Sequence, residues 1–475
     1  MNGNMLEVGE PERWAEANFS GARMGDCRRK RRLKQIAAAM ARAPGGSIPQ
    51  LFESRSQIKA AYDFFDRKEA VPDRLQQGHR KRTMEAAAQC CGTVLFIEDT
   101  TQMVWPGPEA IAGLGPMGSF GKGLQGFLLQ SVLVVGWSGG GVLSILGLAD
   151  QQYYVRKGRP KDESKAAART WKRREFESEL WDRTLQRLGA APKQTRWVRV
   201  ADRGADIYEF LESTPRAGWG FVVRAAHDRR LVGEEGEAAG KLFDVARSAR
   251  VLGGMKLELR AREGRKARTA HLSVSSAAVV IRSTPRPGYA AGALGSVACT
   301  VVRVFESKSE DGRAGDLEWI LLTDAPVQTA EQALEIVRQY AARWTIEEFH
   351  KALKSGLGAE RLQLETAARL FAAISIMSVA ALRLIDLRER MRLEPEAPPE
   401  ASGLNEVELR ILRHQLKRPI QTVREVALAI GRLGGHMNRR ADGMPGWQTL
   451  WRGMKRLNDL AEGYFTALRI MDSGE

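Results

Sequence analysis

The sequence predicts a mixed α/β fold that carries a β-strand-rich insertion and is flanked by helical regions at both ends. Three observations support this prediction. Residues 1–90 show helical periodicity, residues 91–226 alternate strand-sized apolar runs with helices, and residues 369–475 are again helical. A chain of 475 residues is longer than one core usually organises, so we expect two to four domains.

The composition indicates a folded protein with an anionic partner. Apolar residues make up 43% of the chain, charged residues 27%, and the net charge is +16. Such a positive field favours nucleic acid first and an anionic membrane second. The longest apolar runs are strand-sized, which predicts no membrane span, and the four cysteines have neither disulfide density nor zinc spacing. We therefore expect no membrane partner and a reducing cytosol.

Residues 1–90 are predicted to form a helical, basic DNA-binding domain. Between residues 20 and 82 there are 16 Lys and Arg against 6 Asp and Glu. The stretch "RRKRRLKQIAAAMARA" begins an Ala-rich helix, and "PGG" at 44–46 ends it. Small helices with one basic face suit contact with the DNA backbone and entry into a groove. The alternative is a solvated surface helix, the usual fate of a charge run.

The α/β core is predicted from residues 91–226 and is completed by residues 317–368. "TVLFIED" is a strand that ends in acids, and "SVLVVGWSGGGVLSILGLAD" is a β-hairpin with a Gly-rich turn. A long helix, "DESKAAARTWKRREFESELWDRTLQRL", precedes the strand "TRWVRVAD", the short helix "IYEFLEST" and the strand "GFVVRAA". The order β-β-β-α-β-α-β is shared by ribonuclease-H-like folds.

The remaining segments are assigned by their local pattern. Residues 227–316 are rich in Gly, Arg and short β-type runs such as "HLSVSSAAVVIR", and they are predicted to be a β-rich insertion. A helix is expected to begin near Thr329, because Thr329 and Gln332 fit a capping box. Residues 369–475 are predicted to form a helical C-terminal domain.

A polar stripe is predicted along "YAARWTIEEFHKALK", residues 340–354. On a continuous helix with 100° per residue, a sector of about 60° contains Tyr340, Arg343, Glu347 and Lys354. However, Thr345 and Glu348 also fit a capping box, and a break there would misalign the stripe. The alternative is an ordinary surface helix with an i,i+4 ion pair.

Two acids follow buried strands. Asp99 comes after the apolar run "VLFI" and Asp202 after "RWVRVA". Ligands and metals gather at strand ends in α/β layers, although an isolated acid there is usually a turn or capping residue. Together with Glu347 from the helix, these acids form a candidate carboxylate cluster. Hard oxygen ligands of this kind suit Mg²⁺ or Mn²⁺.

These motifs carry a resemblance. They are "IEDTT" around Asp99, "DRGADIY" around Asp202, and the helical set Tyr340, Arg343, Glu347 and Lys354. With "RWTIEEFHKALKSGLGAERLQ", they resemble the bacterial DDE cut-and-paste transposases of the insertion-sequence-four family, of the Tn-five type. The resemblance runs from the basic N-terminus to "GGHMNRRADGMPGWQTLW". It implies a bacterial, nucleoid-associated protein of the cytoplasm.

The resemblance implies a metal-dependent reaction on DNA. Asp99, Asp202 and Glu347 would be catalytic and hold two divalent ions per active site, Mg²⁺ or alternatively Mn²⁺. Two such ions can clamp the attacking and leaving oxygens of an in-line phosphoryl displacement. The implied series is nicking at the transposon end, hairpin formation, hairpin opening and strand transfer into target DNA.

The resemblance also implies contacts to DNA around the acids. Tyr340, Arg343 and Lys354 would grip phosphate, since their side chains donate hydrogen bonds or carry positive charge. Trp319 would stack on a base displaced from the duplex. An alternative of equal weight is that Trp319 packs in the hydrophobic core as part of its strand.

The implied partners are double-stranded DNA and a second copy of the chain. Arg28, Arg32 and Arg42 would contact the inverted-repeat ends, and residues 369–475 would form a homodimer in the synaptic complex. One alternative is a catalytically silent DNA-binding regulator or inhibitor of transposition. Another is a ribonuclease or structure-specific nuclease, which explains the acids and leaves the C-terminal segment without a role.

Overall fold

The structure is a computed structural model in which most of the chain is described. The described residues are 11–107, 110–118, 123–139, 141–157, 177–233, 236–259, 268–283, 295–306, 317–439 and 442–473.

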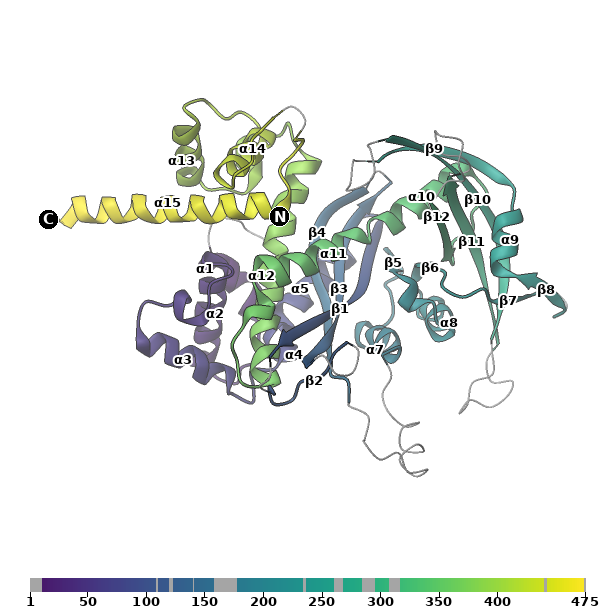
Figure 1. Ribbon diagram of the computed structural model, residues 1–475, viewed down its shortest axis with the longest axis horizontal. Helices are drawn as coiled ribbons and strands as arrows, with labels where there is room; N and C mark the ends of the chain where they lie inside the picture. The colour runs from purple at the N-terminus through teal and green to yellow at the C-terminus, as the bar shows by residue number, and fades with distance from the viewer. Residues whose placement is uncertain are drawn as a thin grey trace, which may run out of the picture.

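The N-terminal part is a cluster of helices packed beside the sheet (Figure 1). Its helices are α1 Pro11–Phe19, α2 Cys27–Arg42, α3 Arg55–Phe65, α4 Pro72–Leu75 and α5 Gln77–Gln89. The basic run forms most of α2, which begins after Asp26, whose side chain accepts a hydrogen bond from the backbone N–H of Arg28. An N-cap of this kind satisfies one of the amides that a helix start leaves free.

One large mixed sheet forms the centre of the molecule. Its strands are β1 Thr93–Pro106, β2 Gly115–Pro116, β3 Leu124–Ser138, β4 Gly141–Tyr154, β5 Arg196–Ala201, β6 Gly220–Arg224, β7 Arg230–Val232, β8 Ala238–Lys241, β9 Val251–Leu259, β10 Arg268–Arg282, β11 Ser296–Glu306 and β12 Glu318–Thr323. The main order is β2-β3-β1-β5-β6-β12-β11-β10-β7-β8, with β4 on β3 and β9 on β10. The predicted hairpin is confirmed as antiparallel β3 and β4, while β5 and β6 run parallel to β1.

The β-rich region between residues 227 and 316 extends the core sheet. Within the described part, β10 and β11 pair with each other, and β11 pairs with β12 of the core. Helices lie against both regions: α7 Glu179–Leu188, α8 Tyr208–Arg216, α9 Leu242–Ser248, α10 Ala330–Ala341 and α11 Trp344–Lys351. The first part of the long helix predicted before α7, residues 162–176, lies outside the described residues.

Side chains alternate across β1, and this alternation decides the surroundings of its two acids. Phe96 packs in a core with Trp197 and residues of α5 and α7, whereas Ile97 belongs to the core shared with the helix that follows α11. Since neighbours along a strand point to opposite faces, Glu98 shares the face of Phe96, and Asp99 shares the face of Ile97.

The helix after α11 is α12, Ala367–Leu393, and it runs through the middle of the molecule (Figure 1). One hydrophobic core joins it to the N-terminal helices and to the sheet, so this core crosses the predicted boundary between residues 1–90 and the α/β part. The sequence prediction overlooked that α12 is long and apolar enough to span a membrane. However, 88% of its most apolar window is buried within the protein, which is the situation of a core helix.

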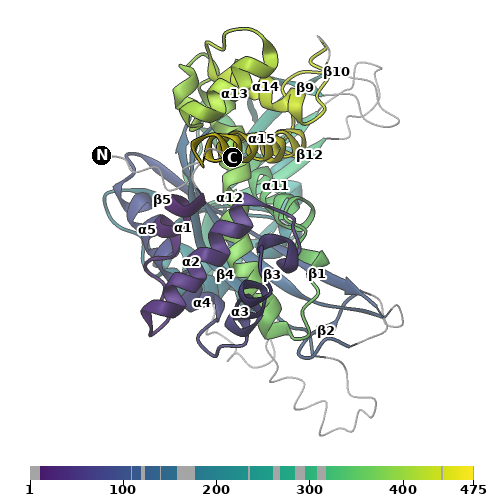
Figure 2. The same ribbon diagram turned by 90° about the vertical axis from the view of Figure 1, so that its left-hand side faces the viewer.

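The C-terminal part is helical. It contains α13 Glu406–Leu416, α14 Val423–Leu433 and α15 Trp447–Ser473, and its small core begins at Met391 near the end of α12. Seen from the side in Figure 2, these helices lie above the N-terminal helices. The last part of α15 projects away from the body of the molecule and leaves apolar side chains exposed, among them Phe465 and Met471.

Candidate active site

Two carboxylates lie where the pairing of two adjacent strands ends. The prediction that the first of these strands ends at its acids is wrong, because β1 continues through Asp99 to Pro106, paired with β3. In the parallel pairing of β1 with β5, Glu98 is opposite Ala201, so Asp99 and Asp202 each follow the last paired position. Neighbouring strands lie about 4.8 Å apart, which brings the two acids close together. The side chain of Asp202 also accepts a hydrogen bond of 2.8 Å from the backbone of Gly204 and thereby caps the short helix Arg203–Ala205.

The third predicted carboxylate, Glu347, is linked to Asp99 through one arginine. The guanidinium of Arg343 lies 3.5 Å from a carboxylate oxygen of Asp99 and forms an ion pair with Glu347 one turn along its own helix. Arg343 is mostly buried, so its positive charge lies between two negative charges in a region with little water. Ion pairs gain strength where water is excluded, provided that the charges are matched.

The helix that carries Arg343 and Glu347 is broken close to the position that the sequence indicated. However, the capping box of Thr345 and Glu348 does not form, because Thr345 lies inside the new helix. α10 begins with the capping box of Thr329 and Gln332, as predicted, and ends at Ala341. α11 begins at Trp344, with Arg343 as its N-cap residue, and a π-helical turn, Ala352–Gly356, follows it. The predicted stripe therefore crosses three segments, and its four side chains do not all reach one place.

Tyr340 and Lys354 have partners of their own. Tyr340 is buried, and its ring packs edge-to-face against Trp319 at 5.2 Å between centroids. Lys354 donates a hydrogen bond of 2.7 Å to the backbone carbonyl of Gln102 and forms an ion pair of 3.2 Å with Glu360. Trp319 is thus part of the packing beneath Tyr340, which is the alternative that the sequence left open.

A hollow of about 350 Å³ opens over the cluster. Its lining includes Asp99, Glu347, His350, Lys354 and Glu360, and Asp202 lies outside this lining. Glu347 is the more open of the two acids, with 35% of its side chain exposed against 16% for Asp99. A phosphate entering the hollow would therefore meet Glu347 and Lys354 before it met Asp99.

The negative charges act on one another. Burial, together with the nearby charges of Asp202 and Glu347, raises the pKa of Asp99 to about 7, although the charge of Arg343 opposes the rise. Burial alone would lower the pKa of Arg343, but its contacts with Glu347 and Asp99 raise it. The cluster thus holds more negative charge than its burial favours, which is the electrostatic condition for binding a cation.

The sequence analysis did not single out His350 and Glu360. His350 is buried, with Nδ1 4.0 Å from the carboxylate of Asp99, and burial lowers the pKa of its ring to about 3. Glu360 accepts a hydrogen bond of 2.9 Å from the backbone N–H of Val104 in addition to pairing with Lys354. The position of His350 three residues after Glu347 was the available signal, because such residues share a helix face.

The donor chemistry fits a hard divalent cation. Asp99, Asp202 and Glu347 supply carboxylate oxygens, which Mg²⁺ and Mn²⁺ prefer. Among the described residues, however, no group of three His, Cys, Asp or Glu side chains is arranged to hold a metal ion. Arg343 contributes the positive charge between Asp99 and Glu347 instead.

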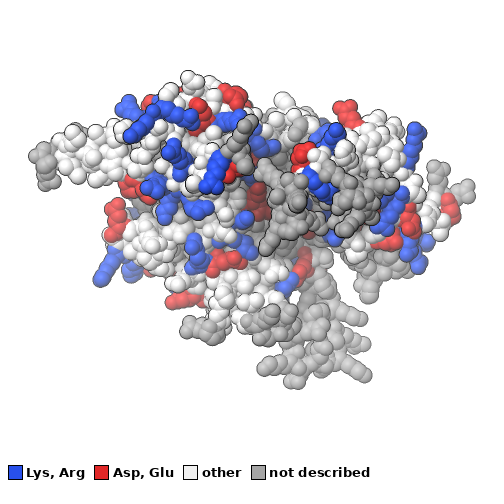
Figure 3. All heavy atoms as spheres, turned by 45° about the horizontal axis from the view of Figure 1, so that its top comes forward, with Lys and Arg blue, Asp and Glu red and all other residues white. Residues whose placement is uncertain are grey.

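The predicted DNA contacts of the N-terminal helices differ in exposure. Arg28 is exposed and Arg32 is half-buried on α2, whereas Arg42 forms an ion pair with Glu12 of the neighbouring helix α1. Lys and Arg side chains are spread over the helical half of the face shown in Figure 3.

Two family models match parts of the chain. Residues 11–70 match the family model described as transposase DNA-binding, and residues 170–383 match that of the transposase DDE domain. Asp202 and Glu347 lie inside the second match, and Asp99 lies between the two.

The chain thus joins a transposase DNA-binding domain to a transposase DDE domain, and together they support a DDE transposase. A domain of this class implies a ribonuclease-H-like core within the mixed sheet, a nuclease or strand-transferase activity, and DNA as the partner.

Proposed function

We propose that this protein is a metal-dependent transposase of the insertion-sequence-four type, which cleaves the ends of a bacterial transposon and joins them to target DNA. The observation that carries the proposal is the contact of Arg343 with both Asp99 and Glu347, beside Asp202, in a chain with both transposase domains. The protein would act on the DNA of the nucleoid and on any DNA that enters it.

Asp99, Asp202 and Glu347 would hold two divalent cations, Mg²⁺ or Mn²⁺. When bound, such ions lower the pKa of an attacking water or 3′-hydroxyl and stabilise the leaving oxygen. Because Arg343 is paired with both Asp99 and Glu347, binding of the cations would release its guanidinium. Arg343 could then bind phosphate oxygens bidentately, with Lys354 as a second positive charge.

The reaction would pass from a nick to a hairpin, then to hairpin opening and strand transfer, with one site serving every step. A hairpin at a DNA end requires sharp distortion of the strand and a displaced base. Trp319 is half-buried against Tyr340, and a base stacking on Trp319 would use the part of the ring that remains accessible. Tyr340 would then act by holding Trp319 in place.

A second copy of the chain would complete the synaptic complex. The exposed apolar side chains near the end of α15 are Tyr464, Phe465, Leu468, Ile470 and Met471. Side chains of this kind on one projecting helix are suited to burial against a partner helix.

A catalytically silent DNA-binding regulator is a second candidate, because no metal-holding group of three is present among the described residues and Arg343 is already paired with two of the acids. The two functions separate in one experiment. The full-length protein is incubated with Mg²⁺ or Mn²⁺ and DNA that carries the inverted repeats flanking its reading frame. Metal-dependent excision that Asp99→Ala abolishes supports the transposase, whereas a mobility shift without cleavage supports the regulator.

A further inference from the structure

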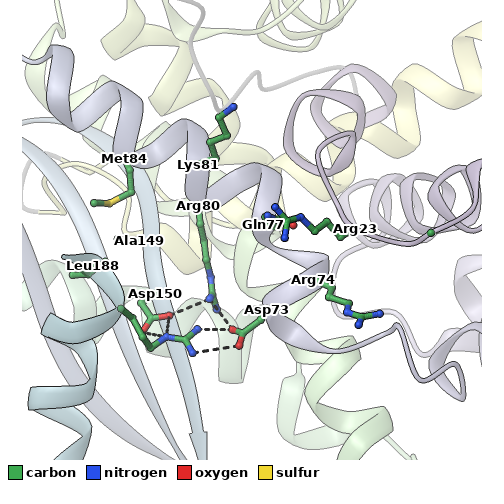
Figure 4. Close-up of a pocket in the computed structure, with 12 residues that line it drawn as sticks. Arg23, Asp73, Arg74, Gln77, Arg80, Lys81, Met84, Ala149, Asp150 and Leu188 are labelled. Carbon is green, nitrogen blue, oxygen red and sulfur yellow. Dashed lines mark hydrogen bonds and ion pairs between the residues drawn. The ribbon is translucent and has the colours of Figure 1, made fainter.

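A second charged hollow lies away from the carboxylates. Its volume is about 800 Å³, and it lies between α4, α5, α7 and the end of β4 (Figure 4). Arg23, from the loop between α1 and α2, contributes to its rim. No role in the proposed cleavage chemistry accounts for this hollow.

Four of its side chains form a closed network of ion pairs. Asp73 lies 2.8 Å from Arg80 and 2.5 Å from Arg187, and Asp150 lies 3.0 Å from each of the same two arginines. Two positive charges therefore balance two negative ones, as the dashed lines in Figure 4 show. This network ties the N-terminal helices to β4 and α7, so it gives the hollow a fixed wall.

The remaining cations of the rim are not balanced in this way. Arg23, Arg74 and Lys81 are exposed; in the part of the chain that the structure describes, Arg23 and Arg74 form no ion pair, and the nearest acid to Lys81 is Glu85 at 3.7 Å. In Figure 4, no dashed line joins Arg23, Arg74 or Lys81 to the network of ion pairs. The rim thus carries an excess of three positive charges.

The hollow is on the opposite face of the sheet from Asp99. Asp150 is opposite Val132 in the pairing of β3 with β4, and Val132 packs in the same core as Phe96 and on the same face as Glu98. Variants at the rim should therefore leave the carboxylate cluster intact. The hollow also joins the two matched domains, since Arg23 lies in the DNA-binding match and Arg187 in the DDE match.

We propose that Arg23, Arg74 and Lys81 bind the phosphodiester backbone of duplex DNA at this hollow and anchor the duplex without taking part in catalysis. Guanidinium groups bind phosphate oxygens bidentately, and each neutralised phosphate releases counterions. The closed network beneath the rim holds the arginines' supporting elements together before DNA arrives, so little ordering is needed on binding. The inference rests on the DNA-binding role of the protein and is independent of its cleavage chemistry.

Salt-dependent binding of the full-length protein tests the proposal. The affinities of wild type and Arg23→Ala/Arg74→Ala for a fluorescent duplex are measured by anisotropy over a range of salt concentrations. The slope of log affinity against log salt should become shallower by about 2 in the double variant, because each lost phosphate contact removes about 0.9. Adding Lys81→Ala to the double variant should make the slope shallower by about one more. Arg23→Gln/Arg74→Gln, which keeps more of the side-chain volume, should give the same change.

A matched variant controls for net charge. Arg230→Ala/Arg282→Ala removes two exposed arginines from β7 and β10, at the far end of the sheet order, and should leave the slope as in wild type. A slope unchanged in the rim variants, or an equal change in this control, would overturn the proposal. Thermal unfolding should be the same in all variants, because these side chains are exposed.

Two duplexes identify the source of the phosphate. If the rim binds any duplex, including target DNA, the double variant should lose affinity equally for an inverted-repeat end and for an unrelated sequence. A loss confined to the inverted-repeat end would assign the hollow to the transposon end. The cleavage rate at saturating DNA should be unchanged in the double variant. If wild type does not cleave at all, the proposed function fails while the binding slopes still decide this inference.

Discussion

Glu98 and Asp99 are neighbours on β1, but they lie on opposite faces of the sheet and have different surroundings. Glu98 is fully buried and forms a bidentate ion pair with Arg199, at 2.5 and 2.9 Å, and Arg199 is also fully buried. Asp99 borders an open hollow, and its arginine partner, Arg343, comes from a separate helix and is shared with Glu347.

The difference shows how the partners of two neighbouring carboxylates separate a pair enclosed by the fold from one beside an open hollow. Arg199 also donates hydrogen bonds to the hydroxyl of Thr214 and the backbone carbonyl of Trp181, so its donors are occupied by the fold. Burial raises the pKa of Glu98, and the charge of Arg199 opposes this effect. The donors of the pair on the Glu98 face are all used by the fold, whereas we propose that the contact of Arg343 with Asp99 is exchanged for a cation or a phosphate.

The largest expected effect is on catalysis at Asp99. Asp99→Asn should reduce metal-dependent cleavage of transposon-end DNA below detection, because it removes a charged oxygen ligand proposed for the metal. DNA binding should persist, and the free energy of unfolding should be unchanged or higher, since repulsion from Asp202 is relieved. Gel analysis of cleavage and a urea titration measure the two properties. Cleavage within tenfold of wild type would contradict the proposed role.

The next effect is on stability at the opposite face. Arg199→Met leaves Glu98 buried without its partner and should lower the free energy of unfolding by about 3–5 kcal/mol. Replacing both partners, as in Glu98→Leu/Arg199→Met, should restore most of this loss, because no uncompensated charge remains. Urea titrations of the two variants test this. Equal losses in both would show that packing, and not the unpaired charge, dominates.

A smaller effect is expected at Arg343, which contacts both Asp99 and Glu347. Arg343→Ala should slow cleavage at saturating DNA by about 10²–10³, the usual cost of removing one donor from a developing charge. Arg343→Lys should fall between this variant and wild type, because it keeps the charge but loses the bidentate geometry. Single-turnover rates, compared with DNA affinities, separate the chemical step from binding. If the variant changes only the DNA affinity and not the single-turnover rate, Arg343 binds the substrate and does not stabilise the transition state.

The smallest expected effect is a pH dependence of the free energy of unfolding, which arises from His79 on the Glu98 face of the sheet. His79 of α5 is fully buried between Asn18 and the backbone N–H of Leu148, and burial lowers its pKa to about 3. Because the folded-state pKa lies below that of the unfolded chain, the contribution of the neutral ring is complete above about pH 6.5 and is lost as the pH falls toward 3.

His79→Gln should therefore show a weaker loss of stability in acid. Between pH 7 and pH 5.5, wild type should lose about 1 kcal/mol more of its free energy of unfolding than the variant. Urea titrations at the two pH values give this difference. Parallel losses in both proteins would show that His79 is not the group that titrates.

Local signals predicted much of the fold. The capping box at Thr329, the Gly-rich hairpin and the strand ahead of Asp99 are short-range patterns, and the structure contains each of them. The position of Asp202 directly after β5 was also predictable, whereas Asp99 lies in the middle of β1, where only the pairing with β5 ends. The extent of the sheet could not be predicted. The pairing of β11 with β12 joins two segments whose sequence patterns do not indicate which residues lie opposite one another.

The sequence by itself determined most of the elements, the basic N-terminal helices and the acid that follows β5, because these depend on residue type and on spacing within one segment. Only the tertiary structure decided that Tyr340 packs on Trp319, that Lys354 binds Gln102, and that Arg343 lies between Asp99 and Glu347. The network of Asp73, Asp150, Arg80 and Arg187 is likewise invisible in the sequence. The partner of a charged side chain is chosen by which segments meet in space, and helical periodicity carries no information about that.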